Sequence, residues 1–258
     1  MENELSSASI ARDLTTSFIG QRVIYYPSLT SSMDMARREA LRGVAEGTVI
    51  VASEQTAGRG RIKRAWLSPK GSVALSIILY PGLADMPSLM MLAPLAVARC
   101  VKGVTGISPQ LKWPNDVLIK GRKITGILIE SSLRGKTVDY TIIGIGININ
   151  IKMADYPEIY GFATSLSDAL GKRVSPLVIV RRLLVEIEGL YRLLPDGDLI
   201  YQEWRGSLIT LGKQVRVKSG RNIYEGIAES VARDGSLLLR RPDGHLTTIV
   251  AGDATLRT

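Results

Sequence analysis

The sequence contains few of the side chains on which most catalytic sites depend. It has one histidine, His245, and one cysteine, Cys100, among 258 residues. These counts argue against a Ser-His-Asp or Cys-His arrangement and against a zinc site with its usual ligands. Cys100 lies in the apolar segment LAVARC, and we interpret it as a buried core residue. Any catalysis would depend on carboxylates, cations, backbone amides or a hydrated magnesium ion.

Long apolar runs and a secretory signal are also missing from the sequence. No run approaches the roughly 20 apolar residues of a membrane span, and the first residues, MENELSSASIARD, are acidic and polar. Together with the single cysteine, these features predict a cytoplasmic protein without membrane association. Hydrophobic residues make up 45% of the chain, which is enough to form a substantial core.

Acidic residues are in the minority. The chain has 33 lysine and arginine residues against 24 aspartate and glutamate residues, so its net charge is +9. This excess predicts an anionic partner: a nucleic acid, a phosphorylated small molecule or an acidic protein. The charge alone does not distinguish among these three.

Periodicity along the chain predicts an α+β fold with two domains. We expect helices at 30–43, 87–104, 176–193 and 197–207, and strands at 47–55, 71–81, 116–119, 123–131 and 139–149. The last three strands are joined by short turns, which indicate an antiparallel meander. From Gly212 onward, short strands alternate with turns, as in a small β-barrel. We therefore predict a mixed, largely antiparallel sheet with helices on one side in residues 1–210, and a β-barrel in residues 211–258.

The strand at 139–149 has isoleucine side chains on one face and little on the other. Gly144 and Gly146 alternate along that second face, and glycine weakens a strand. Either a helix packs closely on the bare backbone or a flat ligand lies on the sheet. The serine and alanine residues of the strand at 71–81 would widen the same face if the two strands are neighbours.

The segment KWPND brings charged residues to the start of a strand. Taken alone, Pro114 and the residues after it are typical of a turn. Lys112, Asp116 and Lys123, however, all fall at the ends of one predicted hairpin, next in sequence to the strand that carries the glycines. Two cations and a carboxylate at one place suit a phosphate ester with its magnesium ion.

The segment EQTAGRGRIKRAW, residues 54–66, combines glycines with four cations. It does not open a helix, as a P-loop would, and it occurs once, unlike a repeated nucleic-acid-binding tail. A solvated loop without function is the simplest alternative. A loop that closes over a polyanion fits better, because glycine lets backbone amides approach the anion and arginine neutralises it. Without ligand, we expect this loop to be mobile.

These features together favour a reaction that needs little base catalysis. A carboxylate that attacks the α-phosphate of ATP is such a case, because the nucleophile is already ionised at neutral pH. The remaining obstacle is the repulsion between two anions, which cations and magnesium can remove.

Four motifs in this order resemble those of the biotin–protein ligases: GRGR followed by tryptophan, KWPND, GRKITGILIE and GIGIN. The resemblance extends from about Gly20 to the end of the chain. It implies a reaction in which biotin and ATP give biotinyl-5′-AMP and pyrophosphate. The biotinyl group then passes to a lysine of a biotin carboxyl carrier protein. The resemblance also implies that the C-terminal domain is SH3-like.

The resemblance assigns roles to individual positions. Biotin would be bound by Ser31, Ser32, Met33, Gln55, Gly58, Arg59, Gly60, Arg61, Lys123, Gly126, Gly144 and Gly146. ATP and the adenylate would be bound by Arg61, Trp66, Lys112, Asn115, Asp116, Lys123 and Asn148. The catalytic residues would be Lys123, Arg59, Arg61 and Asp116, with Asp116 also on the magnesium side. Residues 163–166 resemble the loop on the adenine side, and Phe162 beside them would stack on the base.

The sequence departs from the family pattern at three places. Met33 stands where asparagine is frequent, so a polar contact with biotin is lost or replaced. Lys63 stands where glycine is usual, which makes the loop more basic and stiffer. About twenty residues precede the first strand, too few for the DNA-binding domain of repressor-type members, so we expect no sequence-specific DNA binding. Family habit also suggests a homodimer formed through an exposed sheet edge.

Two alternatives remain open at this point. A lipoate or octanoate ligase would share the chemistry and the architecture, and a panel of acid substrates would distinguish it. A non-catalytic nucleic-acid-binding module would explain the charge of +9, and its binding would depend steeply on salt.

Overall fold

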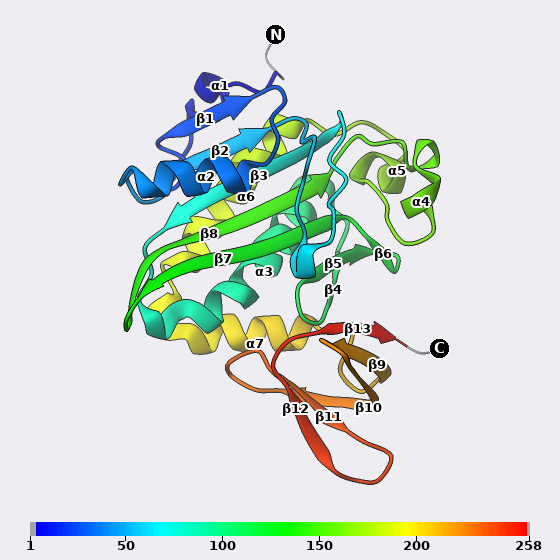
Figure 1. Ribbon diagram of the computed structural model, residues 1–258. Helices are drawn as coiled ribbons and strands as arrows, with labels where there is room; N and C mark the ends of the chain where they lie inside the picture. Colours follow the sequence, from blue (N-terminus) through cyan, green and yellow to red (C-terminus); the bar gives the residue numbers. More distant parts are fainter. Residues whose placement is uncertain (1–3, 257–258) are drawn as a thin grey trace.

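A five-stranded mixed sheet lies at the centre of the computed structural model, which describes residues 4–256 (Figure 1). Its strands lie in the order β1 (Val23–Tyr26), β2 (Val49–Ala52), β3 (Ser72–Leu79), β8 (Thr137–Asn148) and β7 (Thr125–Arg134). β1 and β2 are parallel, and every other neighbouring pair is antiparallel. The expected α+β class with a mixed, largely antiparallel sheet is therefore confirmed.

The two faces of this sheet pack against different helices. The odd-numbered residues of β3 and β8, such as Leu75 and Ile145, face the main hydrophobic core together with α3 (Met86–Thr105) and α6 (Pro176–Tyr191). The helices α1 (Ser7–Ala11) and α7 (Gly197–Ser207) adjoin α6 and α3 respectively. On the opposite face, α2 (Ser32–Leu41) packs through Met33 against the sheet. The long helices α3 and α6 thus lie on one side of the sheet as expected, and α2 forms a separate layer on the other side.

The start of α2 follows directly from its sequence. Ser31 is the N-cap, and its Oγ accepts a hydrogen bond from the amide of Asp34 at 3.4 Å. This cap satisfies one of the free amides of the first turn. It also fixes Ser32 and Met33 at the end of the helix that lies over β3 and β8.

The apolar helix α3 corrects one expectation from the sequence. With the turn before it, it forms a stretch, Leu83–Thr105, whose length and mean hydropathy of 1.3 are sufficient to cross a membrane. Helices at the centre of a globular fold have the same length and composition. In this fold α3 packs against α6 and α7, and residues such as Leu92 and Val97 belong to the main core. The helix continues through Pro94.

The predicted three-stranded meander is wrong in one respect. The strand β5 (Asp116–Ile119) belongs to a separate small sheet with β4 (Gln110–Lys112) and β6 (Arg122–Lys123), whereas β7 and β8 pair in the main sheet. The predicted strand at 123–131 is thus divided at Ile124. Alternation of apolar residues fixes the faces of a strand but does not identify its neighbour.

The C-terminal residues form an antiparallel sheet. Its order is β12 (Leu246–Ile249), β11 (Leu237–Arg240), β10 (Asn222–Val231), β9 (Gln214–Ser219) and β13 (Asp253–Leu256). Among the described residues β12 and β13 are its edges, so hydrogen bonds do not close it into the predicted barrel. It is attached to the preceding residues by Trp113 Nε1, which donates to the Gly235 carbonyl at 2.8 Å. The boundary between 210 and 211 stays a prediction.

Two short helices, α4 (Pro157–Tyr160) and α5 (Leu166–Leu170), follow β8. Figure 1 shows them beside the end of the main sheet and close to β6. Their position brings residues 159–163 to the edge of a cavity described below.

A buried carboxylate fixes the segment before β1. Glu188 on α6 accepts hydrogen bonds from the amides of residues 17–19 at 2.7–3.0 Å, and Arg192 pairs with it at 2.9 Å. Burial raises the pKa of Glu188, but the three amides and Arg192 outweigh this effect and hold the pKa below its usual value.

Glu188→Gln should therefore destabilise the fold in a pH-dependent way. At neutral pH the free energy of unfolding should fall by about 2 kcal/mol, because charge-assisted hydrogen bonds are lost. The pKa is lower in the folded state, so the contribution is complete above about pH 4.3 and disappears as the pH falls through the folded-state value. Urea unfolding at several pH values measures this, and an equal difference at pH 7 and pH 3 would contradict it.

Candidate active site

Glycines of two neighbouring strands, β7 and β8, form a floor on one face of the main sheet. In the β-sheet register, Gly146 of β8 lies between Ala74 of β3 and Gly126 of β7. One row along, Gly144 lies between Ser76 and Leu128. We call Gly126, Gly144 and Gly146 the glycine floor. The strand of small residues, β3, is thus a neighbour of β8, which is the condition under which it widens this face.

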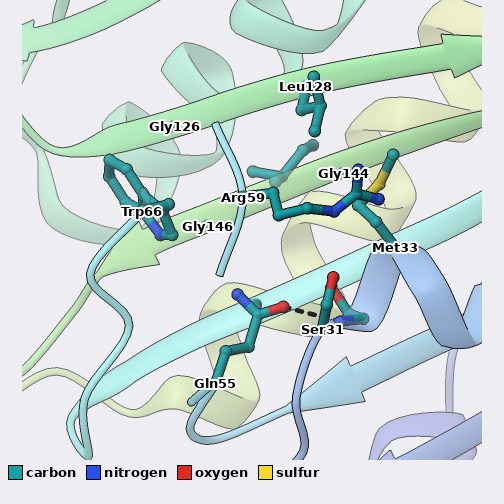
Figure 2. A pocket seen from close by; sticks show the side chains of 12 residues that line it. Ser31, Met33, Gln55, Arg59, Trp66, Gly126, Leu128, Gly144 and Gly146 are labelled. Atoms are coloured by element: carbon teal, nitrogen blue, oxygen red, sulfur yellow. Dashed lines mark hydrogen bonds between the residues drawn. The ribbon is translucent and has the colours of Figure 1, made fainter. Parts of the chain in front are cut away.

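Two large side chains cover the glycine floor. A Cβ added at Gly146 would lie 2.1 Å from Trp66 Nε1, and one added at Gly144 would lie 2.4 Å from Met33 Sδ. Figure 2 shows the Trp66 indole over Gly126 and Gly146, with Met33 at the other end. The remaining cavity is only about 20 Å³, far below the roughly 300 Å³ of a small ligand pocket. A ligand on this floor must therefore displace the indole or the thioether.

The wall beside the floor is polar. The amide of Ser32 donates to Gln55 Oε1 at 2.8 Å, and Ser76 Oγ donates to Ser32 Oγ at 2.8 Å. Two donors that line the cavity, Arg59 Nε and Trp66 Nε1, are buried without a hydrogen-bond partner among the described residues. Unpaired buried donors are costly, so the site suits a flat ligand that brings acceptor atoms.

A second, larger cavity of about 600 Å³ adjoins the first and shares Trp66, Gln55, Arg59 and Gly126 with it. Of the predicted residues it is also lined by Gly58, Gly60, Arg61, Asn115, Asp116, Lys123 and Asn148. Ile159 and Phe162 lie at its edge, and the Phe162 side chain is exposed. Trp66, which was assigned to the nucleotide, thus also covers the floor assigned to biotin.

One carboxylate organises the cations of the larger cavity. The small sheet pairs Lys112 with Asp116 across β4 and β5, and Lys123 follows on β6. Asp116 forms ion pairs with Lys123 and, at 2.9 Å, with Lys112. Burial raises the pKa of Asp116, but the two ammonium groups outweigh it and hold that pKa below its usual value. Lys112 is not among the residues that line the cavity, but it is paired with Asp116, which lines it.

The arrangement around Asp116 bears on the predicted magnesium. Its Oδ1 pairs with Lys123 and its Oδ2 with Lys112. Within residues 4–256 no group of three His, Cys, Asp or Glu side chains could hold a metal ion. The donor set therefore does not fit a magnesium ion held by the protein alone, and a magnesium ion would depend on the phosphates of a nucleotide for its other ligands.

The arginines of the GRGR loop point to different parts of the site. Arg61 Nη1 donates to Asn115 Oδ1 at 2.9 Å, and its Nη2 donates at 3.0 Å to the carbonyl of Gly252, directly before β13. Burial lowers the pKa of Arg61, and the nearby Asp253 opposes that effect. Arg59 instead pairs with carboxylates on α2 and β7.

The backbone of this loop folds back on itself. The amide of Gly60 donates to the Arg64 carbonyl at 2.7 Å, and the amide of Trp66 donates to the Gly58 carbonyl at 2.9 Å. At its tip Ile62 has φ 54°, a left-handed conformation that is strained for a β-branched residue. The side chain of Lys63 lies outside the described part of the chain. The mobility of the loop without ligand stays a prediction.

Three carboxylates that pair with arginines of the loop were not predicted. Asp34 and Glu130 pair with Arg59, and Asp253 pairs with Arg64 at 2.7 Å. The position of Glu130 near the site could have been predicted, because it falls on the same face of its strand as Gly126. Asp34 lies in the first turn of α2, where an acidic residue is common in any helix, so its type did not mark it for the site. Asp253 is about 190 residues from the loop, and no local pattern connects the two.

Comparisons with known proteins give the class first. Residues 25–148 match the Biotin/lipoate A/B protein ligase family, and residues 210–257 match the Biotin protein ligase C terminal domain. The bifunctional ligase/repressor BirA of Bacillus subtilis is 36% identical over 93% of this chain and 76% of its own length. The biotin--[acetyl-CoA-carboxylase] ligase of Paracoccus denitrificans is 32% identical, over 82% of this chain and 93% of its own length.

Solved structures agree with these relatives. The biotin protein ligase from Aquifex aeolicus in complex with biotin and ATP matches with a TM-score of 0.77 and 29% identity, over 92% of this chain and 99% of that one. This chain therefore belongs to the biotin protein ligase family, and it is a ligase enzyme. The resemblance drawn from the four motifs is confirmed, whereas the roles of individual residues stay predictions.

Gly146→Ala should expel the indole from the floor, because its new Cβ would overlap Trp66 Nε1. We expect the emission of Trp66 to shift to the red as the ring enters water, and Trp66→Phe identifies its share of the fluorescence. The control is Gly206→Ala on α7, where a Cβ meets nothing within 4 Å. Unchanged emission in a folded Gly146→Ala protein would show that the indole does not rest on Gly146.

Proposed function

We propose that this protein activates biotin with ATP to form biotinyl-5′-AMP and then transfers biotin to a lysine of a biotin carboxyl carrier protein. The main support is the junction of the two cavities. A floor without side chains, suited to a flat bicyclic acid, adjoins a cavity that contains Lys123, Arg61 and the exposed ring of Phe162. The names of the relatives and of the matching structures agree with this proposal.

In the first step the biotin carboxylate attacks the α-phosphorus of ATP. A bond forms between the carboxylate oxygen and the α-phosphorus. The bond from the α-phosphorus to the oxygen that bridges to the β-phosphate breaks, and pyrophosphate leaves. The carboxylate is already ionised, so no general base is required. Lys123 and Arg61 reduce the repulsion between the two anions. Asp116 holds the Lys123 ammonium group at the cavity through their ion pair.

In the second step the amine of the carrier lysine attacks the acyl carbon and AMP leaves. The mixed anhydride also reacts with water, so the site has to exclude water until the lysine arrives. Residues of the loop line both cavities. Arg61 and Arg64 also connect the loop to the C-terminal domain, through the Gly252 carbonyl and the Asp253 carboxylate. A loop closed over the adenylate would provide this protection.

Several finer features remain part of the proposal. Magnesium would arrive with ATP, since Asp116 alone is a poor site for it. The C-terminal sheet would have the SH3-like topology, with β12 and β13 as its open edges. A homodimer, a cytoplasmic location and the lack of sequence-specific DNA binding stay predictions from the sequence. Sedimentation and gel-shift experiments at physiological salt test the first and the last.

The deciding experiment is the exchange of labelled pyrophosphate into ATP with biotin, lipoate, octanoate or no acid present. We expect exchange that depends on biotin, because adenylation is reversible until an acceptor is added. Exchange with another acid would retain the chemistry and change the substrate. No exchange with any acid, from folded protein with magnesium present, would refute the proposal.

Arg61→Gly should increase the rate at which biotinyl-5′-AMP escapes from the enzyme. The loss of charge-assisted hydrogen bonds costs about 1.5–3 kcal/mol, so the escape rate should rise by about tenfold or more. Biotinylation should also become less selective among the lysines of added proteins. Filter binding of labelled adenylate measures the rate, and Arg221→Gly in the exposed β9–β10 turn is the control. An unchanged escape rate would remove Arg61 from the closing of the loop.

A further inference from the structure

The two arginines of the GRGR motif have partners of different charge. Arg59 Nη1 donates to Glu130 Oε1 at 3.0 Å, and its Nη2 donates to Asp34 Oδ1 at 2.8 Å. Arg61 donates to neutral oxygens, and its nearest carboxylate, Asp253, is 3.9 Å away. One arginine of the motif is thus held by two carboxylates, and the other is not.

The partners of Arg59 belong to two elements that build the small cavity. Asp34 follows Met33 in the first turn of α2. Glu130 lies on β7 two residues beyond Leu128, so it faces the same side of the sheet as the glycine floor. Figure 2 shows the Arg59 side chain extended across Gly144 toward Met33, at the opposite end of the floor from Trp66. The cluster therefore connects the loop, α2 and β7 around one cavity.

The charge of Arg59 is already balanced without a nucleotide. Arg37 pairs with both Glu130 and Asp34, so two guanidinium groups face two carboxylates. Arg59 would have to give up two ion pairs before it could neutralise a phosphate, whereas Arg61 would not. The buried Arg59 Nε–H has no hydrogen-bond partner in the described part of the chain, so it is a free donor at the small cavity. An acceptor on the bound acid would satisfy this donor.

We propose that Asp34 and Glu130 are positioning residues that hold Arg59 as a wall of the small cavity, and that this pair sets the affinity for the acid rather than for the nucleotide. The inference rests on the proposed function, because it takes biotin as the acid. It divides the motif into two parts, in which Arg59 belongs to the acid site and Arg61 to the phosphate site.

The test uses Glu130→Gln and Asp34→Asn, which keep the shape of each side chain and remove its charge. Titration calorimetry without ATP should show a dissociation constant for biotin about tenfold higher in each variant, which corresponds to about 1.4 kcal/mol. The KM for ATP in the exchange reaction, at saturating biotin, should change by less than about twofold. Two separate variants keep the test decisive if one of them fails to fold.

A double-mutant cycle separates positioning from a general structural effect. If Glu130 acts through Arg59, Arg59→Gln combined with Glu130→Gln should weaken biotin binding no more than Arg59→Gln alone. The matched control is Glu229→Gln, which removes a carboxylate paired with Arg240 in the C-terminal sheet at 2.7 and 2.8 Å. It should leave biotin binding unchanged.

The outcomes distinguish the two proposals. If the wild-type protein binds biotin and both charge-neutral variants bind it equally well, the role of Asp34 and Glu130 is refuted and the proposed function stands. Equal losses of biotin and ATP affinity, or additive effects in the cycle, would also refute it. If the wild-type protein binds another acid in place of biotin, the proposed function fails, and with it this inference for biotin.

Discussion

The close approach that three glycines allow is the constraint on which the rest of the site depends. Gly126, Gly144 and Gly146 occupy adjacent strands in register, so that a patch of the main sheet carries no side chains of its own. Any larger residue at Gly146 would overlap the indole that now lies there. The opposite face of the same strands is built of isoleucine packed into the main core, which keeps the sheet rigid despite the glycines. A flat, rigid surface inside a fold is a platform for a planar ligand, and the polar groups at its rim then decide which ligand.

The arrangement around the platform explains how one loop can serve two ligands. Arg59 and Trp66 of this loop line both the nearly filled cavity and the open one beside it. Arg59 is directed to carboxylates beside the first cavity, whereas Arg61 is directed to Asn115 and to the C-terminal domain beside the second. A carboxylate and a triphosphate must approach within bonding distance although both are anions. In the proposed arrangement, balanced charge on the acid side and unbalanced cations on the phosphate side would lower that repulsion only where the new bond forms.

Local patterns in the sequence predicted what depends on neighbours along the chain. The two faces of β8 and the extent of α6 and α7 follow from periodicity and turn chemistry, and the structure has them. The separate sheet of β4, β5 and β6 was missed, because apolar alternation does not encode which strand pairs with which. The contact of Arg61 with Gly252 was missed for the same reason, since it joins residues 191 positions apart. Long-range partners depend on how elements pack, and a single sequence does not report that packing.

The indole on the floor follows from the same constraint. Bare backbone on an open sheet face would leave apolar surface in contact with water, and a side chain that covers it recovers the hydrophobic contribution. Trp66 is large and flat enough to do so, yet its Nε1–H has no hydrogen-bond partner within residues 4–256. The covered state is therefore stabilised by burial and destabilised by one unpaired donor. A ligand of similar shape that carries its own acceptors restores the burial and satisfies the rim, so exchange of indole for ligand requires little net change in buried surface. On the proposed function, the preference for the ligand would then come from the polar rim, which Ser32, Gln55 and Arg59 line.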